Sequence, residues 1–451
     1  MAMRGFLGSI CVVAAVLCGC SSTERTDESE TTVAASETSS STSAVLNSDS
    51  TATSLTSTPS VESSTVTAPP VGADTTVAPS SPDRARSLAK FDPRRFIEQF
   101  ASDELAGRDN DTAGSAKARR LLIEDLSTFT EPAYPNATGD RRFLQSVDHG
   151  TNVLAVLPGS DLANEYVVLG AHYDHLGSDC TIIDERPVDT ICNGATDNAA
   201  GVAAALAVAH SLAATGPHRR SIIVAFWDRE EDNFGGSLGY LADPPAPVAA
   251  TRAYVNFDIQ GADLSDTLAN VTFMVGAETG GSRLIEAARQ AATSSTLATE
   301  ALSLIFGQGR SDHAVFVNAG VASVFFTDAN NGCYHTTNDE ADRVNYAKLD
   351  EQIKTAFALM QHLSTTDAPP TFVPHPATSS FTDAEAVREV LATFEPSFAE
   401  LSTADQSRFR ESLNALSKIV AAGPSRYDDA AIGTVIASAA GAVSTFARLG
   451  C

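Results

Sequence analysis

Positive charge is scarce in this sequence, which has 30 Lys and Arg residues against 56 Asp and Glu residues in a chain of 451. A protein that binds nucleic acid needs a basic face to pair with phosphates. The acidic balance therefore argues against a nucleic-acid partner. It says little more, because acidic surfaces commonly serve only to keep a protein soluble. Hydrophobic residues make up 43%, as expected for a globular core, and no internal repeat is evident.

A long hydrophobic run is missing at the amino terminus, where the apolar stretch 7–17 is too short to span a bilayer. With Arg4 in front of it, this stretch is typical of an export signal. It ends in Leu-Cys-Gly-Cys at 17–20, which resembles a bacterial lipobox. We therefore expect a lipoprotein signal peptide over residues 1–19 and a lipid on Cys20 that anchors the exported protein to the outer face of a cell membrane. The alternative is an ordinary secretory signal cleaved nearby.

Large apolar residues are nearly absent from residues 20–85, which are rich in Ser and Thr. Such a segment cannot bury enough surface to offset its ordering entropy, so we predict a disordered stalk. A folded pattern begins near Ala89, and we assign residues 86–367 to one domain. Prolines after Asp367 mark a break, and only helical patterns follow it, over residues 380–451.

Short, near-continuous apolar strands alternate with helices in the first folded segment. This pattern predicts an α/β fold with a mostly parallel central sheet flanked by helices, followed by a small all-helical appendage. Sheets of this kind place their sites at the carboxyl ends of strands. The expected strands cover residues 152–157, 166–170, 221–226, 253–257 and 322–326, and the expected helices cover 91–100, 116–126, 198–213, 383–394, 403–421 and 428–449.

Four cysteines follow Cys20, and an exported context permits disulfides between them. Four cysteines allow three pairings. A bond between Cys180 and Cys192 would close a short loop and is the pairing that we favour, which leaves Cys333 with Cys451. The sequence alone proves neither bond, and a zinc-binding thiolate at Cys333 is the alternative.

Several expected strands lead into side chains that can bind a metal. Taken singly, each has an ordinary explanation: a lone Asp before a helix is usually an N-cap, and adjacent glutamates usually lie on a solvated surface. Their shared position at strand ends of one α/β unit indicates a site. Zinc is bound by His nitrogen and carboxylate oxygen, and two histidines with three carboxylates suffice for two ions roughly 3.5–4 Å apart if one carboxylate bridges them. The residues concerned are His172, Asp197, Glu230, Glu231, Asp258 and His335.

The order and spacing of these residues resemble a family of double-zinc exopeptidases that includes secreted bacterial aminopeptidases, glutamate carboxypeptidases and glutaminyl cyclases. The resemblance runs over about residues 91–363. Ala200 and Asn233 depart from the family pattern, but neither is at a ligand position. The matching blocks are 105–108, 170–175, 194–201, Glu230-Glu231 with Gly236, Ser237 and Tyr240, then 256–258, 311–313 with Phe316, and 334–336 with Asp339.

The resemblance implies a three-layer sandwich that binds two Zn²⁺ ions. Asp197 would bridge the two metals. His172 and Asp258 would complete the ligands of one ion, and Glu231 and His335 would complete those of the other.

The same resemblance implies the catalytic roles. Glu230 would be the general base, and Asp174 would hydrogen-bond the far nitrogen of His172 and fix its orientation. His175 is the alternative to His172 as ligand. His313 is interpreted as a structural or pocket residue, and Asp312 with Asp339 as residues that orient loops.

The implied function is that of a metallo-aminopeptidase, which hydrolyses the amino-terminal bond of peptides or proteins. One alternative is a carboxypeptidase or amidohydrolase of the same fold, for which Arg310 is the one cationic group that we can name to bind a substrate carboxylate. Another is a surface binding protein without turnover. Peptides are the expected partners, and the sequence does not indicate an oligomeric state.

Overall fold

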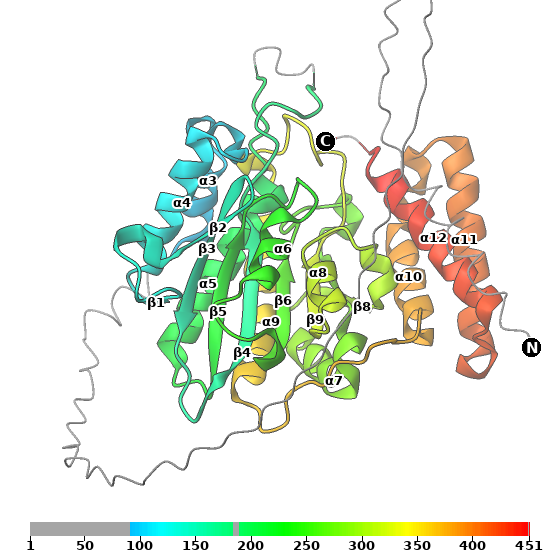
Figure 1. The fold of residues 1–451 in the computed structure, drawn as a ribbon. Coiled ribbons are helices and arrows are strands. Elements are labelled where there is room, and N and C mark those ends of the chain that lie inside the picture. The colour runs from blue at the N-terminus through cyan, green and yellow to red at the C-terminus, as the bar shows by residue number, and fades with distance from the viewer. Residues whose placement is uncertain (1–90, 184–188, 450) are drawn as a thin grey trace, which may run out of the picture. The chain divides into compact units, whose positions relative to one another are not determined.

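A mixed sheet of nine strands forms the centre of the computed structural model, which describes residues 91–183, 189–449 and 451 (Figure 1). The predicted signal peptide, the predicted lipidation site at Cys20 and the predicted stalk lie outside the described residues. The strands are β1 (Glu131–Pro132), β2 (Leu144–Val147), β3 (Gly150–Leu157), β4 (Leu162–His172), β5 (Arg220–Trp227), β6 (Thr251–Phe257), β7 (Val271–Val275), β8 (Ala298–Leu302) and β9 (Ser323–Thr327).

The strand order is β1-β3-β5-β4-β6-β9-β7-β8, with β2 paired to β3. In the centre of the sheet, the four strands β5, β4, β6 and β9 all run parallel to one another. Toward the edges, β3 runs antiparallel to β5, and β7 runs antiparallel to β9. The α/β prediction is therefore confirmed, with a parallel centre and antiparallel additions on both sides.

One face of the sheet is covered by helices from the first two thirds of the chain and by the long helix that follows β9. Alternate strand residues such as Val167, Leu169 and Ala171 point toward this layer, as the two-residue period of a strand requires. The Ala-rich helix α5 packs directly on these residues, because small side chains permit close approach. The helices of this layer are α3 (Pro93–Phe100), α4 (Ala113–Leu126), α5 (Ala200–Thr215), α7 (Gly281–Ala292) and α9 (Tyr346–Thr365).

The opposite face is covered by two short helices and by the helices of the carboxyl-terminal segment. Near the centre of the sheet, Tyr254 stacks on Phe316 with ring centroids 4.0 Å apart. Farther along, Phe273, Val275 and Phe325 form one hydrophobic core with the carboxyl-terminal helices. The helices of this layer are α6 (Gly235–Ala242), α8 (His313–Asn318), α10 (Phe381–Phe394), α11 (Thr403–Ala422) and α12 (Asp429–Phe446).

Sheet register places the carboxyl-terminal helices on the same face as α6 and α8. In β6, Asn256 lies two residues after Tyr254 and therefore points to the same face of the sheet. Phe325 of β9 pairs with Asn256, so it also points to that face. Asp383, in the first turn of α10, also accepts hydrogen bonds from the Ser303 backbone N–H at 2.8 Å and from the Ser303 hydroxyl at 2.7 Å. The predicted helical segment therefore shares its core with β7 and β9 (Figure 1).

Both disulfides that we favoured are present. Cys180 bonds to Cys192 across 12 residues, and Cys333 bonds to Cys451 across 118 residues. The second bond joins the end of the chain to the loop that follows β9. Cys333 is thus not available as a zinc thiolate.

Two described helical stretches are long and apolar enough to cross a membrane by length and composition alone. In the first, Ala195–Thr215, 72% of the most apolar 18-residue window is buried, as expected of a core helix that packs on a sheet. The second, Asp429–Phe446, is 33% buried in that window and packs on α10 and α11 through one side. Length and composition do not make either of them a membrane span.

Candidate active site

Side chains from five segments converge at the carboxyl ends of the parallel strands. The strand order places β4 between β5 and β6, so the residues that follow these strands become neighbours. His172 ends β4, Glu230 and Glu231 follow β5, Asp258 follows β6, His335 lies in the loop after β9, and Asp197 precedes α5.

The first group of potential metal ligands contains His172, Asp197 and Asp258. The Nε2 atom of His172 lies 3.2 Å from Asp197 Oδ1 and 3.4 Å from Asp258 Oδ1. All three residues are buried. The sequence assigned these same residues to one ion.

The second group contains Asp197, Glu231 and His335, together with His175. The Nε2 atom of His335 lies 3.2 Å from Asp197 Oδ2 and 3.2 Å from Glu231 Oε2. Asp197 thus directs one carboxylate oxygen to each group. That arrangement is the one required of a bridging ligand.

The turn before α5 presents Asp197 in this position. Gly194 has a φ angle of 55°, and a Cβ atom there would lie 2.3 Å from the Asp197 carbonyl oxygen. Glycine is therefore required at this close approach. Asp339 fixes the same turn, because its carboxylate accepts hydrogen bonds from the backbone N–H groups of Thr196 at 2.9 Å and of Asp197 at 3.0 Å. The expectation that Asp339 orients a loop agrees with these contacts.

The donor atoms fit zinc in spacing and in chemistry. Zinc bonds of about 2.0–2.2 Å in tetrahedral geometry separate neighbouring ligand atoms by about 3.4 Å. The four separations between donor atoms given above, 3.2 to 3.4 Å, match that value. In addition, the buried Nε2 atom of His335 makes no hydrogen bond with any described residue, although two carboxylate oxygens lie 3.2 Å away.

Electrostatics point to the same need for a cation. Among the ion pairs of the described residues, Asp197, Glu231 and Asp258 pair only with histidines. Burial and Asp197 disfavour the charged form of Glu231, but His175 and His335 outweigh them and lower its pKa to about 2. Burial also opposes a charge on His335, yet Asp197 and Glu231 raise its pKa to about 10. Several buried carboxylates thus face imidazole groups whose cationic form they favour.

His175 belongs to the second group and does not replace His172. Its Nδ1 atom lies 2.9 Å from Glu231 Oε1, whereas the Nε2 atom of His172 faces Asp197 and Asp258. Within the described part of the chain, the buried Nε2 atom of His175 has no hydrogen-bond partner. The alternative assignment of His175 in place of His172 is therefore not the one that the geometry favours.

Asp174 supports both His172 and the glutamate pair. The Nδ1 atom of His172 lies 3.2 Å from the Asp174 carbonyl oxygen and 3.5 Å from Asp174 Oδ1. The same carboxylate accepts hydrogen bonds from the backbone N–H groups of Glu230 at 3.1 Å and of Glu231 at 3.3 Å. The contacts with Glu230 and Glu231 were not expected from the sequence, because these residues lie 56 and 57 positions after Asp174 in the chain.

Arg108 is a buried cation that the sequence analysis did not single out, although it ends the matching block 105–108. Its guanidinium donates hydrogen bonds to the carbonyl oxygens of Phe100, Tyr173, Asn193 and Gly194 at 2.6 to 3.0 Å. These bonds hold the segments that precede Asp197 and follow His172. Burial lowers the pKa of Arg108 to about 10, against the opposing effect of the carboxylates around it.

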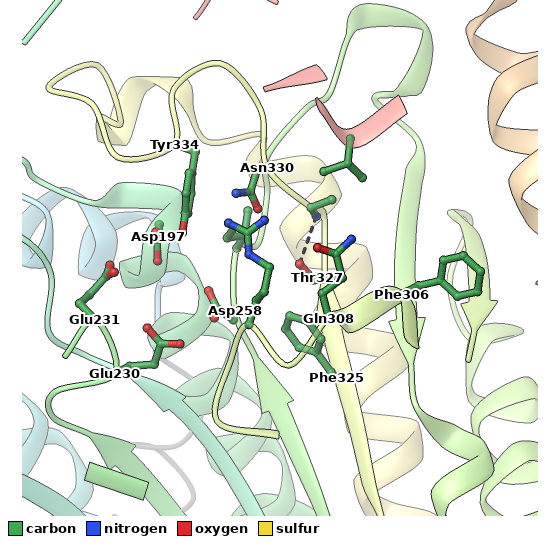
Figure 2. Close-up of a pocket in the computed structure, with 15 residues that line it drawn as sticks. Asp197, Glu230, Glu231, Asp258, Phe306, Gln308, Phe325, Thr327, Asn330 and Tyr334 are labelled. Carbon is green, nitrogen blue, oxygen red and sulfur yellow. Dashed lines mark hydrogen bonds between the residues drawn. The ribbon is translucent and has the colours of Figure 1, made fainter. Parts of the chain in front are cut away.

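A pocket opens above the two groups. Figure 2 shows the carboxylates of Asp197, Glu230, Glu231 and Asp258 gathered on one side, with Tyr334 beside Asp197. Arg310 is the one basic residue among the described residues that line the pocket. The remaining lining residues are Ile259, Phe306, Gly307, Gln308, Phe325, Thr327, Ala329, Asn330, Tyr334 and Val443.

A parallel-centred sheet with histidines and carboxylates gathered at its strand ends is the arrangement of a metal-dependent hydrolase. Residues 152–360 match the family model described as Peptidase family M28. The chain therefore contains an M28 peptidase domain, and the resemblance to the double-zinc exopeptidases is confirmed. Together, the family match and the donor groups support a zinc-dependent metallopeptidase.

Two of the curated proteins that match this chain do so over part of their length. The vacuolar membrane protease of Schizosaccharomyces japonicus is 25% identical over 247 residues, which are 54% of this chain and 26% of that protein. Leupeptin-inactivating enzyme 1 of Streptomyces exfoliatus is 26% identical over 263 residues, 51% of this chain and 52% of that protein. The chain thus spans 26% of the length of the first relative and 52% of the length of the second. A solved aminopeptidase, LapA of Legionella pneumophila, is 18% identical with a TM-score of 0.49, covering 63% of this chain and 75% of that one.

Proposed function

We propose that this chain is an aminopeptidase that uses two zinc ions and hydrolyses the amino-terminal bond of peptides. The observation that carries the proposal is the position of Asp197, whose two carboxylate oxygens face His172 on one side and His335 on the other. His172, Asp197 and Asp258 would hold one ion. Asp197, Glu231 and His335 would hold the other, with His175 beside them.

Glu230 is the group best placed to move protons. Zinc held at this site would polarise the scissile carbonyl and lower the pKa of a water molecule to about 7. Glu230 lines the pocket and belongs to neither of the two groups built around Asp197, although it lies close enough to His172 and Glu231 to form a third donor group with them. Burial raises the pKa of Glu230. Its carboxylate, which is not assigned to zinc, could take a proton from the attacking water and deliver it to the leaving amine.

The charge of the pocket favours an amino-terminal substrate. Among the described lining carboxylates, Asp197, Glu231 and Asp258 would be neutralised by the ions they hold, so a free substrate amine would be attracted to Glu230. Asp174 holds Glu230 and Glu231 by their backbone N–H groups, so these carboxylates are fixed in place before substrate arrives. A blocked amino terminus would lose this attraction.

A substrate panel tests the proposal. The zinc-loaded chain is assayed on matched peptide amides that have either a free or an acetylated amino terminus. We expect turnover of the free form only, because the acetylated form offers no cation to Glu230, the lining carboxylate that is not assigned to zinc. Equal turnover of both forms would show that the enzyme does not recognise the amino terminus.

Replacement of the base is the second test. We expect Glu230→Gln to lower kcat by about 10²–10⁴-fold while zinc content stays near that of the unmodified chain. The matched change Glu231→Gln, one residue away, should reduce zinc content, because Glu231 Oε2 lies in a donor group. Elemental analysis of both variants beside kcat separates the two roles. Loss of zinc in Glu230→Gln would contradict the role of base.

Arg310 favours a second candidate, a carboxypeptidase. Its side chain is exposed in the pocket and makes no ion pair with any of the described residues. A guanidinium in that position is suited to bind a substrate carboxylate. If this candidate is correct, turnover will require a free carboxyl terminus, and Arg310→Gln will raise KM for such substrates without changing zinc content.

Export and membrane attachment through a lipid on Cys20 remain part of the proposal. They rest on the sequence of residues 1–20 and place peptide hydrolysis outside the cytoplasm.

A further inference from the structure

We propose that the carboxyl-terminal helices are part of the substrate site and that Val443 of α12 limits the size of the side chain that the pocket accepts. Val443 is half-buried and lines the pocket that contains Glu230 and Asp258. It lies in a segment 380–451 that begins beyond the last residue matched by the peptidase family, at 360. The proposal rests on the proposed peptidase activity in one respect, namely that the group bound in the pocket is an amino-acid residue of a peptide.

The pocket wall is continuous with the core of the carboxyl-terminal helices. Phe325 belongs to both, and Phe306 and Ala329 line the pocket while packing against the same core. Ala442, the neighbour of Val443, is buried in that core. The position of α12 relative to the pocket is therefore set by apolar packing beside Val443.

A covalent bond fixes the same helix to the loop that contains His335. Cys451 lies a few residues beyond the end of α12 and is bonded to Cys333, which precedes the pocket residue Tyr334. The two backbones also meet directly, because a Cβ atom on Gly332 would lie 1.8 Å from the Leu449 carbonyl oxygen. Val443 is thus held at a set distance from the donor groups.

The chemistry of this wall indicates what it contacts. Phe306, Phe325, Ala329 and Val443 supply apolar lining of the pocket, beside the polar Gln308, Thr327 and Asn330. Figure 2 shows Phe306 and Phe325 on the side away from the carboxylates of Glu230 and Glu231. A bound residue whose amine and scissile carbonyl lie at the metal-donor side of the pocket would direct its side chain toward the apolar lining residues. A larger residue at 443 should then exclude large side chains, and a smaller one should admit them.

The test uses the zinc-loaded full chain with Val443→Trp and Val443→Ala. Ala437→Trp serves as the control, because it adds the same ring to an exposed position of α12. Each protein is assayed on leucine, phenylalanine and alanine peptides. Binding of L-leucine and L-alanine is measured by calorimetry, which requires no turnover and applies to the product of either exopeptidase.

We expect Val443→Trp to weaken L-leucine binding and to lower kcat/KM for leucine peptides by about tenfold or more, with little change for alanine. Val443→Ala should shift the phenylalanine-to-alanine ratio in the opposite direction, and Ala437→Trp should match the unmodified chain. Val443→Ala keeps the test valid if the tryptophan variant does not fold. If the chain binds L-leucine through Val443 but cleaves no peptide, the proposed activity fails and this inference stands. An unchanged leucine-to-alanine ratio in Val443→Trp together with an unchanged phenylalanine-to-alanine ratio in Val443→Ala, or no binding of L-leucine to the unmodified chain, would overturn it.

Discussion

At the scale of single residues, the buried polar groups differ in whether the protein satisfies them. Arg108 is surrounded by carbonyl oxygens that accept hydrogen bonds from its guanidinium, so its charge is supported by the fold. His313 is the opposite case. It is fully buried, stacks on Phe325 with ring centroids 4.3 Å apart, and neither of its ring nitrogens has a hydrogen-bond partner among the described residues. An isolated buried imidazole of this kind must stay neutral.

This environment predicts a pH-dependent stability. Burial lowers the pKa of His313 to about 3, whereas an imidazole in the unfolded chain has a pKa of about 6.5. Between these values the unfolded state binds a proton that the folded state does not, so stability falls as the pH drops below about 6.5. Between about pH 7.5 and about pH 5, we expect the unmodified chain to lose about 2 kcal/mol more free energy of unfolding than His313→Phe does. The variant keeps an aromatic ring stacked on Phe325.

Urea unfolding of the zinc-free proteins at the two pH values measures this difference. Zinc is omitted because acid also protonates its ligands. Parallel pH curves for His313→Phe and the unmodified chain would contradict the prediction.

At the scale of elements, loops and helix ends position the site more than the strands do. The turn before α5 presents Asp197, and the loop after β9 presents His335. The Cys180–Cys192 loop pairs with the second of these loops, because Thr181 donates its backbone N–H to the His335 carbonyl oxygen at 2.9 Å. The loop with His335 is thus held by one disulfide-closed loop on one side and by the Cys333–Cys451 bond on the other.

The two disulfides should differ in what they contribute to stability. In the chain-entropy description, a bond that closes about 15 residues contributes about 3 kcal/mol, and one that closes about 100 residues about 4.7 kcal/mol. The separations here are 12 and 118 residues. We therefore expect the Cys333→Ser, Cys451→Ser double variant to lose more free energy of unfolding than the Cys180→Ser, Cys192→Ser double variant, by about 1–2 kcal/mol. Denaturant titration of both measures this, and the reverse order would refute it.

At the scale of the whole molecule, negative charge dominates, with a formal net charge of −26 at pH 7. The site concentrates this charge in a buried place, where carboxylate repulsion is poorly screened. Bound cations would relieve it, and they bind the folded state because the donor groups converge only there. Zinc binding and folding should therefore be coupled.

Removal of zinc should lower the melting temperature. A ligand that binds only the folded state stabilises it by about 2.7 kcal/mol at a concentration about 100 times its Kd. We expect the melting temperature of the chelator-treated chain to be several degrees lower and to return to its original value when zinc is added. This change in melting temperature measures the coupling. Asp197→Ala should show no recovery, because it removes an oxygen from both groups. Equal zinc responses in the two proteins would exclude Asp197 as the shared ligand.

The sequence by itself indicated part of the elements and the pattern of residues at their ends, whereas β1, β2, β7, β8 and α6 to α9 were not expected. The expected strands and helices lie within a few residues of those observed, since apolar periodicity follows directly from backbone geometry. His172, Asp258 and the glutamate pair were found because parallel strands bring their carboxyl ends to one edge. Each of these signals is local, because it is contained within a single strand and the residues that follow it.

Only the tertiary structure decided how distant groups meet. The two oxygens of Asp197, the carboxylate of Asp174 under the glutamate pair, and the carbonyl oxygens around Arg108 depend on contacts between segments far apart in the chain. No local pattern distinguishes Val443 from other apolar residues of α12, yet it alone of that helix lines the pocket in the described structure. The physical reason is that periodicity specifies which face of an element is buried, whereas packing between elements decides what that face contacts.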